Sequence, residues 1–256
     1  MAAIAALLQS RTALAALRRT LPKHGPTVVS CRSTAALKRL LENRLVDAVV
    51  LAPTATLLPE LAELRGRLPG IPVVAYGHFR PDDGELLLAC RKHAVALVAV
   101  EGIDDPLVGD MVARTSVTAE RRRALADAPR MLRLTEPLQR AAWNLLLGEV
   151  ERPIRTIALA QRLQVSREHL SRQFGAGGAP NLKRVIDLTR IACAAQLLSN
   201  PGYSPATVVR LLHFASSSHL GSTARRIANV ATSGLGALGP QGVLTAFVRG
   251  NTRSRV

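Results

Sequence analysis

The chain has 256 residues, of which 48% are hydrophobic and 3% aromatic. This length and composition argue against extended disorder and suffice for two domains of ordinary size. Lys and Arg outnumber Asp and Glu by 34 to 18, which gives a formal net charge of +16. Such an excess suits a polyanionic partner, because neutralised phosphates release their condensed counterions. No apolar run reaches the roughly 18 residues that a membrane-spanning helix needs, so we expect no membrane partner.

The basic excess is concentrated in one half of the chain. Residues 130–256 contain 17 Lys and Arg against 5 Asp and Glu, whereas residues 1–129 contain 17 against 13. A solvated basic surface would explain the excess taken by itself. Its concentration in the second half favours a surface that faces nucleic acid.

In the first half, short apolar runs alternate with amphipathic stretches. The runs have the length of strands buried on both faces and are Ile4–Leu8, Thr27–Cys31, Asp47–Leu51, Pro72–Tyr76 and Ala96–Val100. The helical stretches between them are Arg11–Leu21, Thr34–Asn43, Leu57–Leu68 and Asp83–His93. Ser33 and Asp82 stand where helix N-caps belong. This alternation predicts a doubly wound, five-stranded parallel sheet with helices on both faces.

A fifth helix is predicted to begin near Pro106 and to run towards Ala126, through the basic cluster Arg121–Arg123. After this helix, the sequence pattern changes and predicts consecutive short helices without strands between them. We therefore expect an α/β domain at residues 1–114, a helical linker at 115–133 and an all-α domain at 134–256.

The α/β pattern resembles the receiver domain of response regulators over residues 1–114. The family's functional positions have changed, however: Gln9–Ser10–Arg11 replaces the acidic pair, Ala52 the phosphoacceptor, Gly77 the Thr or Ser, and Glu101 the Lys. Magnesium-assisted phosphoryl transfer needs carboxylates for the cation and for the nucleophile. The resemblance thus implies a receiver fold that is not phosphorylated and binds no metal.

Two roles remain open for this domain. It dimerises the protein or docks a partner, or it binds a small effector at the carboxyl ends of its strands, where doubly wound sheets place ligands. No glycine-rich fingerprint follows a strand, and no nucleophile motif or ligand cluster is present. We therefore expect neither an enzyme nor a cofactor.

The all-α half is predicted to begin with a helix at Thr135–Val150 that is capped at Thr135. Trp143 of this helix is expected to lie buried or half-buried in the domain core. Residues 156–174 follow as two short helices joined at Gln164–Ser166. In the first, Ile157, Leu159, Ala160 and Leu163 are predicted to face inward. Ser166 caps the second, whose inner face is Leu170 and Phe174. Its outer face carries Arg167, Glu168, Ser171 and Arg172.

A second helix pair is predicted downstream, at Pro205–Leu212 and Ser217–Ile227, with a turn at His213–Ser216. Ser217 is taken as the counterpart of Ser166, 51 residues earlier. A long apolar helix at Asn181–Asn200 lies between the pairs as a strut. The glycine-rich stretch at residues 175–180 lacks the ending of a phosphate loop and is interpreted as a turn between helices. A last short helix is expected after Thr232.

These stretches resemble the DNA-binding domain of AraC/XylS-type transcription regulators over about Leu134–Val230. The resemblance is carried by the nine residues Ser166–Phe174, by Leu188–Leu198 and by Phe214–Leu220. It implies two helix-turn-helix units whose recognition helices enter successive major grooves, about 34 Å apart. The DNA-binding residues that it implies are Arg167, Glu168, Ser171 and Arg172 in the first unit, and Ser217, Ser218, Gly221, Ser222, Arg225 and Arg226 in the second.

The second unit departs further from the family's pattern. His213 stands where a turn glycine is usual, Val209 where alanine is common, and Ala224 where a buried aromatic is common, while Gly221 weakens the helix. We therefore predict that the first helix provides most of the specificity and that the second mainly grips the DNA backbone. The alternative function is an architectural protein that coats DNA with low specificity.

The partners implied are double-stranded DNA, RNA polymerase and a second copy of the chain through its amino-terminal domain. Cys31, Cys90 and Cys193 have neither metal-ligand spacing nor an even count for disulfides. They are interpreted as small core residues in a reducing, cytoplasmic setting. The acid-free first 41 residues are similar to a transit peptide, but Ile4–Leu8 is needed as the first strand.

Overall fold

The structure is a computed structural model that describes residues 2–23, 25–151, 153–175 and 178–253. It forms two compact units, one of Met1–Glu120 with Asn200–Gly202 and one of Arg121–Ser199 with Tyr203–Val256. The division between Glu120 and Arg121 falls inside the predicted linker. In the described part of the chain, none of the helices combines the length and the apolar character that crossing a membrane requires.

The first unit contains one five-stranded parallel sheet. Its strands are β1 (Ala3–Leu7), β2 (Thr27–Ser30), β3 (Val46–Leu51), β4 (Val73–Gly77) and β5 (Leu97–Val100), in the order β2-β1-β3-β4-β5. This is the order of flavodoxin-like doubly wound sheets, to which receiver domains belong. The predicted fold class is therefore confirmed, and every strand lies within a residue of its predicted bounds.

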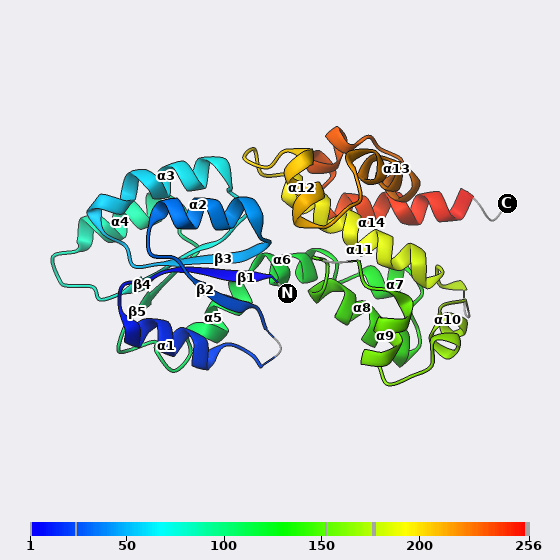
Figure 1. The fold of residues 1–256 in the computed structure, drawn as a ribbon, viewed down its shortest axis with the longest axis horizontal. Helices are drawn as coiled ribbons and strands as arrows, with labels where there is room; N and C mark the ends of the chain where they lie inside the picture. The colour runs from blue at the N-terminus through cyan, green and yellow to red at the C-terminus, as the bar shows by residue number, and fades with distance from the viewer. Residues whose placement is uncertain (1, 24, 152, 176–177, 254–256) are drawn as a thin grey trace. The chain divides into compact units, whose positions relative to one another are not determined.

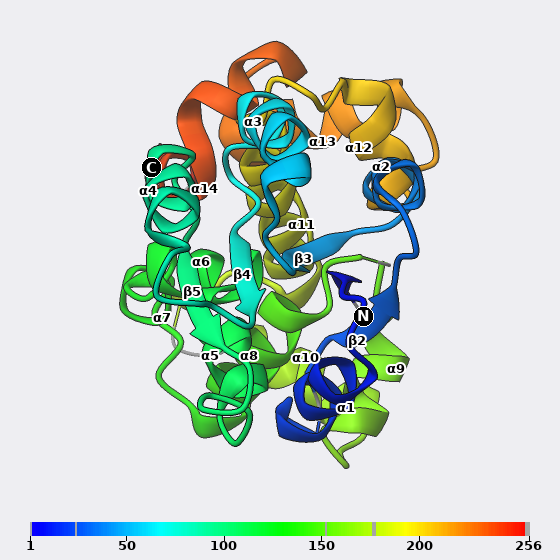
Figure 2. The same ribbon diagram turned by 90° about the vertical axis from the view of Figure 1, so that its left-hand side faces the viewer.

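Helices cover both faces of this sheet (Figure 1). α1 (Arg11–Thr20) and α5 (Val108–Thr115) lie on one face, and α2 (Thr34–Asn43), α3 (Leu58–Arg67) and α4 (Gly84–Lys92) lie on the other, as Figure 2 also shows. Ser33 caps α2 as predicted, with its Oγ accepting from Ala36 N at 3.2 Å. The N-cap of α4 is Asp83 rather than Asp82.

The core of this unit is densest at the central strands. β3 and β4 are buried along their whole length, whereas β2 and β5 are partly exposed because each has a neighbour on one side only. The expectation that all five strands are buried on both faces is therefore wrong for the two edges. On the α1 face, Gly109 permits close packing: a Cβ there would lie 2.4 Å from Leu21 N.

The predicted fifth helix is broken in the structure. α5 ends at Thr115, Ser116 is extended with ψ 159°, and α6 (Val117–Ala124) and α7 (Ala128–Met131) follow. Ser116 starts α6 by accepting a hydrogen bond from Ala119 N through its Oγ at 3.1 Å. A serine that caps a new helix thus ends the continuous helix expected from the periodicity alone.

Arg121 shows that the basic cluster is more than a linker. Its side chain is buried in the second unit and donates to Leu147 O at 3.2 Å, Cys193 Sγ at 3.0 Å and Gln196 Oε1 at 3.2 Å. Arg122 and Arg123, in contrast, are exposed. One arginine of the three therefore belongs to the core of the helical unit.

The second unit is all-α, as predicted. Its helices are α8 (Pro137–Gly148), α9 (Thr156–Arg162), α10 (Arg167–Gly175), α11 (Leu182–Leu198), α12 (Pro205–Leu211), α13 (Ser217–Ala228) and α14 (Leu235–Arg253). α8 is capped by Glu136, with Gln139 completing a capping box, rather than by Thr135. Trp143 is buried in α8, as expected.

α11 is the central helix of this unit. Figure 1 shows it running between the helix pairs α9–α10 and α12–α13, and its buried residues cover nearly its whole circumference. α14 packs along it, with Gly236 so close that a Cβ would lie 2.5 Å from Leu198 O. The expected last short helix is thus longer than predicted, and it is interrupted at Gly239, which has φ 60° and ψ −179°.

Candidate functional site

The first helix pair, α9 and α10, has the predicted turn. Gln164 adopts a left-handed conformation with φ 57°, which reverses the chain after α9. Ser166 Oγ then accepts from His169 N at 3.1 Å and caps α10 as predicted. The glycine-rich turn after α10 includes residues 176–177, which lie outside the described residues.

The inner face of this pair is anchored in the core. Leu170 and Phe174 are fully buried, as are Leu159 and Ala160 of α9. Ile157 is 53% exposed, so its predicted inward position is wrong. At about 100° per residue, Ile157 lies roughly 110° away from the centre of the face formed by the other inward residues of α9.

Gln139 of α8 supports the end of α10. Its Oε1 accepts from Glu136 N at 3.1 Å, and its Nε2 donates to Gln173 O at 2.7 Å. One buried amide therefore caps α8 and satisfies a carbonyl in the last turn of α10. Sequence reasoning missed this residue, although its position three residues after Glu136 is the spacing of a capping box.

The outer face of α10 is free. Its exposed polar side chains make no hydrogen bond or ion pair with any described residue; they are Arg167, Glu168, Ser171 and Arg172. Two guanidiniums with no partner among the residues that the structure describes, on a helix with a buried inner face, can bind acceptors of an external ligand. They are able to do so without losing a contact that stabilises the helix.

The second helix pair, α12 and α13, repeats this construction with one correction. The N-cap of α13 is Ser216, whose Oγ accepts from His219 N at 3.0 Å, so Ser216 and not Ser217 is the counterpart of Ser166. Measured from the caps, Ser217, Ser218, Gly221 and Ser222 occupy the helical positions of Arg167, Glu168, Ser171 and Arg172. The four predicted residues of α10 therefore match four of the six predicted in α13, position by position.

A buried arginine of α11 holds the second turn. His213 is left-handed there, with φ 49°. Arg190 Nη2 donates to Leu212 O at 2.7 Å, and its Cζ lies 4.0 Å from the ring centroid of buried Phe214. Burial lowers the pKa of Arg190, and Asp187 opposes that shift. Sequence reasoning missed this role, although Arg190 is the one charged residue in the stretch Leu188–Leu198 of the strut.

On the outer face of α13, the positions that match those of α10 carry small, uncharged residues. Ser217, Ser218 and Ser222 are exposed, and Ser222 Oγ donates to the helix carbonyl His219 O at 3.1 Å. Gly221 is half-buried, and a Cβ there would meet Thr232 Oγ1 at 3.4 Å.

The two arginines at the end of α13 differ. Arg226 Nη2 forms an ion pair with Asp187 Oδ2 at 2.8 Å, whereas Arg225 is exposed and makes no such contact with the described residues. Of the two arginines predicted to contact phosphates, only Arg225 has no ion pair with a described residue.

The receiver-like positions meet at the carboxyl ends of the strands. Glu101 is buried there and accepts hydrogen bonds from the hydroxyls of Ser10 and Thr12, the latter at 2.7 Å. Its other oxygen lies 3.5 Å from His78 Nε2. Glu101, at the position where receiver domains have a lysine, is therefore held by the hydroxyls of Ser10 and Thr12. No group of three or more Asp, Glu, His or Cys side chains among the described residues is arranged to hold a metal ion.

Beside this network, Tyr76 Oη donates to Asp105 Oδ1 at 2.6 Å. This hydrogen bond is the main cause that lowers the pKa of Asp105, and burial raises the pKa of Tyr76. Tyr76, in β4, thus holds Asp105, in the loop after β5, close to the strand ends.

Comparisons with known proteins add little to this geometry. No family model matches the sequence, and no curated protein is significantly similar to it. Among solved structures, full-length FixJ from B. japonicum shows 16% sequence identity and a TM-score of 0.39, over 88% of this chain and 96% of that one. A likeness at that score carries no argument about function.

Proposed function

We propose that this chain is a sequence-specific DNA-binding transcription regulator of the AraC/XylS type, which reads two successive major grooves with α10 and α13. One observation carries the proposal. Each of these helices begins at a serine cap, has its inner face buried, and leaves three matching helical positions exposed, while the fourth is exposed in α10 and half-buried at Gly221 in α13. Both pack against α11, so the two outer faces belong to one scaffold. This is the form of paired recognition helices.

The electrostatics of the helical half favour DNA as the partner. Residues 130–256 carry 17 Lys and Arg and only 5 Asp and Glu. One of those acids, Asp187, is already paired with Arg226. A basic surface of this kind gains affinity for the duplex from counterion release, and the affinity falls as salt rises.

The two recognition helices have different tasks in this proposal. Arg172 of α10 has a free guanidinium, which can bond to both N7 and O6 of a guanine and contribute roughly 1–3 kcal/mol of discrimination. The matching position of α13 is Ser222, a short side chain that already donates within the helix. We assign base recognition mainly to α10, and phosphate contacts mainly to α13 through Arg225.

The receiver-like unit serves as a regulatory and dimerisation domain without phosphorylation. Ala52 stands at the phosphoacceptor position, and Glu101 takes the place of the lysine. Three large apolar side chains are exposed on α4 and on the segment before α5: Leu88 at 67%, Ile103 at 73% and Leu107 at 61%. We place the protein contact of this unit at these exposed apolar side chains. The partner proposed is a second copy of the chain, with RNA polymerase as a further contact of the regulator.

The proposal is tested by selecting bound duplexes from random and genomic DNA with the full-length protein and then measuring affinity against salt. We expect a motif with two elements about ten base pairs apart, bound about a thousandfold or more tighter than random DNA. An Arg91→Ala variant removes one exposed charge from the other unit and should recover the same motif. Salt-sensitive binding with no recovered motif would favour the architectural function, and the assigned base contacts would then be wrong.

A further inference from the structure

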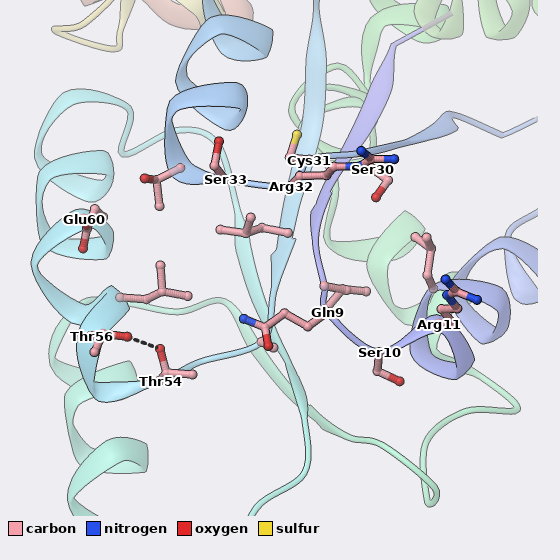
Figure 3. Close-up of a pocket in the computed structure, with 16 residues that line it drawn as sticks. Gln9, Ser10, Arg11, Ser30, Cys31, Arg32, Ser33, Thr54, Thr56 and Glu60 are labelled. Carbon is pink, nitrogen blue, oxygen red and sulfur yellow. Dashed lines mark hydrogen bonds between the residues drawn. The ribbon is translucent and has the colours of Figure 1, made fainter.

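A cavity of about 810 Å³ opens at the carboxyl ends of β1, β2 and β3, entirely within the first unit. Figure 3 shows the loops that follow these three strands around it, with the first turns of α1, α2 and α3 at its rim. β1 and β3 are neighbours in the sheet, but α1 and α3 cover opposite faces. The cavity therefore lies at the switch point, where doubly wound sheets bind ligands.

The wall next to α1 and β2 is strongly positive. Arg11 and Arg32 both line the cavity there, and both are exposed (Figure 3). Neither guanidinium forms an ion pair or hydrogen bond with a described residue, so their charges are not neutralised within the fold. α1 and α2 also point their amino-terminal ends at this wall, and neither has an acidic residue in its first turn. The dipole of α2 adds to the two full charges, whereas the start of α1 also faces the Glu101 carboxylate through Ser10 and Thr12.

The opposite and inner walls differ in character. Leu14, Ala52 and Leu57 supply apolar surface. The Gln9 side chain projects into the middle of the space in Figure 3 and has no partner among the described residues, so its amide can donate and accept. Glu60, the one carboxylate among the lining residues, lies on α3 across the cavity from the two arginines. The cavity thus has a basic end, an apolar surface and a polar centre.

From this arrangement we infer that the amino-terminal unit binds a phosphate monoester of mononucleotide size, with the phosphate between Arg11 and Arg32 and a planar base against the apolar wall. The volume lies within the range of about 300–1,000 Å³ that is usual for small-molecule sites. Two guanidiniums match the geometry of a phosphate dianion and bind it by charge-assisted hydrogen bonds. This inference goes beyond DNA binding and does not depend on it.

The test titrates full-length protein with adenosine, guanosine, cytidine and uridine 5′-monophosphates, and with the four nucleosides, by isothermal calorimetry. At least one nucleotide should bind with Kd below about 1 mM, which corresponds to about −4 kcal/mol. Its nucleoside should bind at least about tenfold more weakly, because it lacks the charged group. Arg11→Gln and Arg32→Gln should each weaken nucleotide binding by about tenfold or more, since each removes one charge-assisted contact.

Matched controls are Arg18→Gln in α1, the helix that contains Arg11, and Arg39→Gln in α2, the helix that follows Arg32; both are exposed arginines that do not line the cavity. They should leave Kd within about twofold. Duplex binding by Arg11→Gln and Arg32→Gln should be unchanged, which separates this site from the proposed DNA interface and shows that the variants are folded. Failure of all four nucleotides to bind, equal binding of nucleosides, or equal losses in the control variants would each overturn the inference.

Discussion

The two helix pairs have the same backbone construction, but their exposed side chains differ in size and charge. α10 and α13 each begin at a serine cap after a left-handed turn residue. The exposed positions of α10 hold two arginines and a glutamate, whereas those of α13 hold serines and a half-buried glycine. The inner anchors also differ, because Phe174 has Ala224 as its counterpart. A repeated backbone therefore does not imply a repeated task, and the difference points to recognition by one helix and grip by the other.

The largest expected effect is at the anchor that only the first pair has. Phe174→Ala should lower the free energy of unfolding by about 3–5 kcal/mol, because it removes a fully buried aromatic side chain and leaves a cavity. Denaturant unfolding measures the change. Ile157→Ala, at an exposed position of α9, is the control and should cost less than about 1 kcal/mol. Equal losses in the two variants would show that α10 is not anchored as described.

Arg190 provides the corresponding support for the second pair. Arg190→Ala should destabilise the protein by about 2–4 kcal/mol, because Leu212 O loses its donor and Phe214 loses its stacked guanidinium. Hydrogen exchange should show faster opening at α12 and α13 than at α9 and α10. Lys183→Ala, at an exposed position of α11, is the matched control. Uniform loss of protection in both pairs would contradict a specific role in the second turn.

Under the proposed function, the ion pair between Arg226 and Asp187 keeps Arg226 from contacting a phosphate. Asp187→Asn should release Arg226 for phosphate contact and tighten binding to random duplex DNA by up to about tenfold at low salt. The slope of log affinity against log salt should become steeper by up to about one. Asp127→Asn breaks an exposed pair with Arg130 and should change neither quantity. No change with Asp187→Asn would mean that Arg226 faces away from DNA.

Substitution of the left-handed turn residues by glycine has the smallest expected effect on stability. His213 and Gln164 both have a left-handed φ, at 49° and 57°, a region that glycine adopts without steric cost. His213→Gly and Gln164→Gly should each raise the melting temperature, with a gain of at most about 1 kcal/mol. Differential scanning calorimetry resolves the shift. Destabilisation of His213→Gly alone would show that the His213 side chain contributes to the second turn.

The predictable part of the fold follows from local patterning. The β-strands, helices α1 to α4 and the two helix pairs were predicted nearly to the residue, because apolar periodicity and serine caps are properties of short stretches. The break at Ser116 was missed because a serine within a helical pattern is compatible with both continuation and a new cap. Ile157 was misplaced for a different reason: α9 is too short for its periodicity to define a residue at the edge of the buried face.

The candidate site was predictable in its exposed residues and not in its supports. Arg172 was placed on the outer face by the helix pattern, and Ser222 was implied by the family resemblance. Arg190 and Arg121 were assigned no structural role, because their partners are backbone carbonyls and side chains from distant helices, such as Leu212 and Leu147. The pairing of Arg226 with Asp187 likewise joins two helices that are far apart in sequence. Tertiary contacts of charged groups leave no periodic trace in the chain.

Base-by-base specificity of two single variants tests the division of labour most directly. On the site selected by the native protein, Arg172→Ala should lose roughly 1–3 kcal/mol of discrimination at one base pair in the half contacted by α10. Ser222→Ala should keep the discrimination at every position within about 0.5 kcal/mol. Loss of specificity with Ser222→Ala, while Arg172→Ala keeps full preference, would contradict the assignment of recognition to α10 and grip to α13.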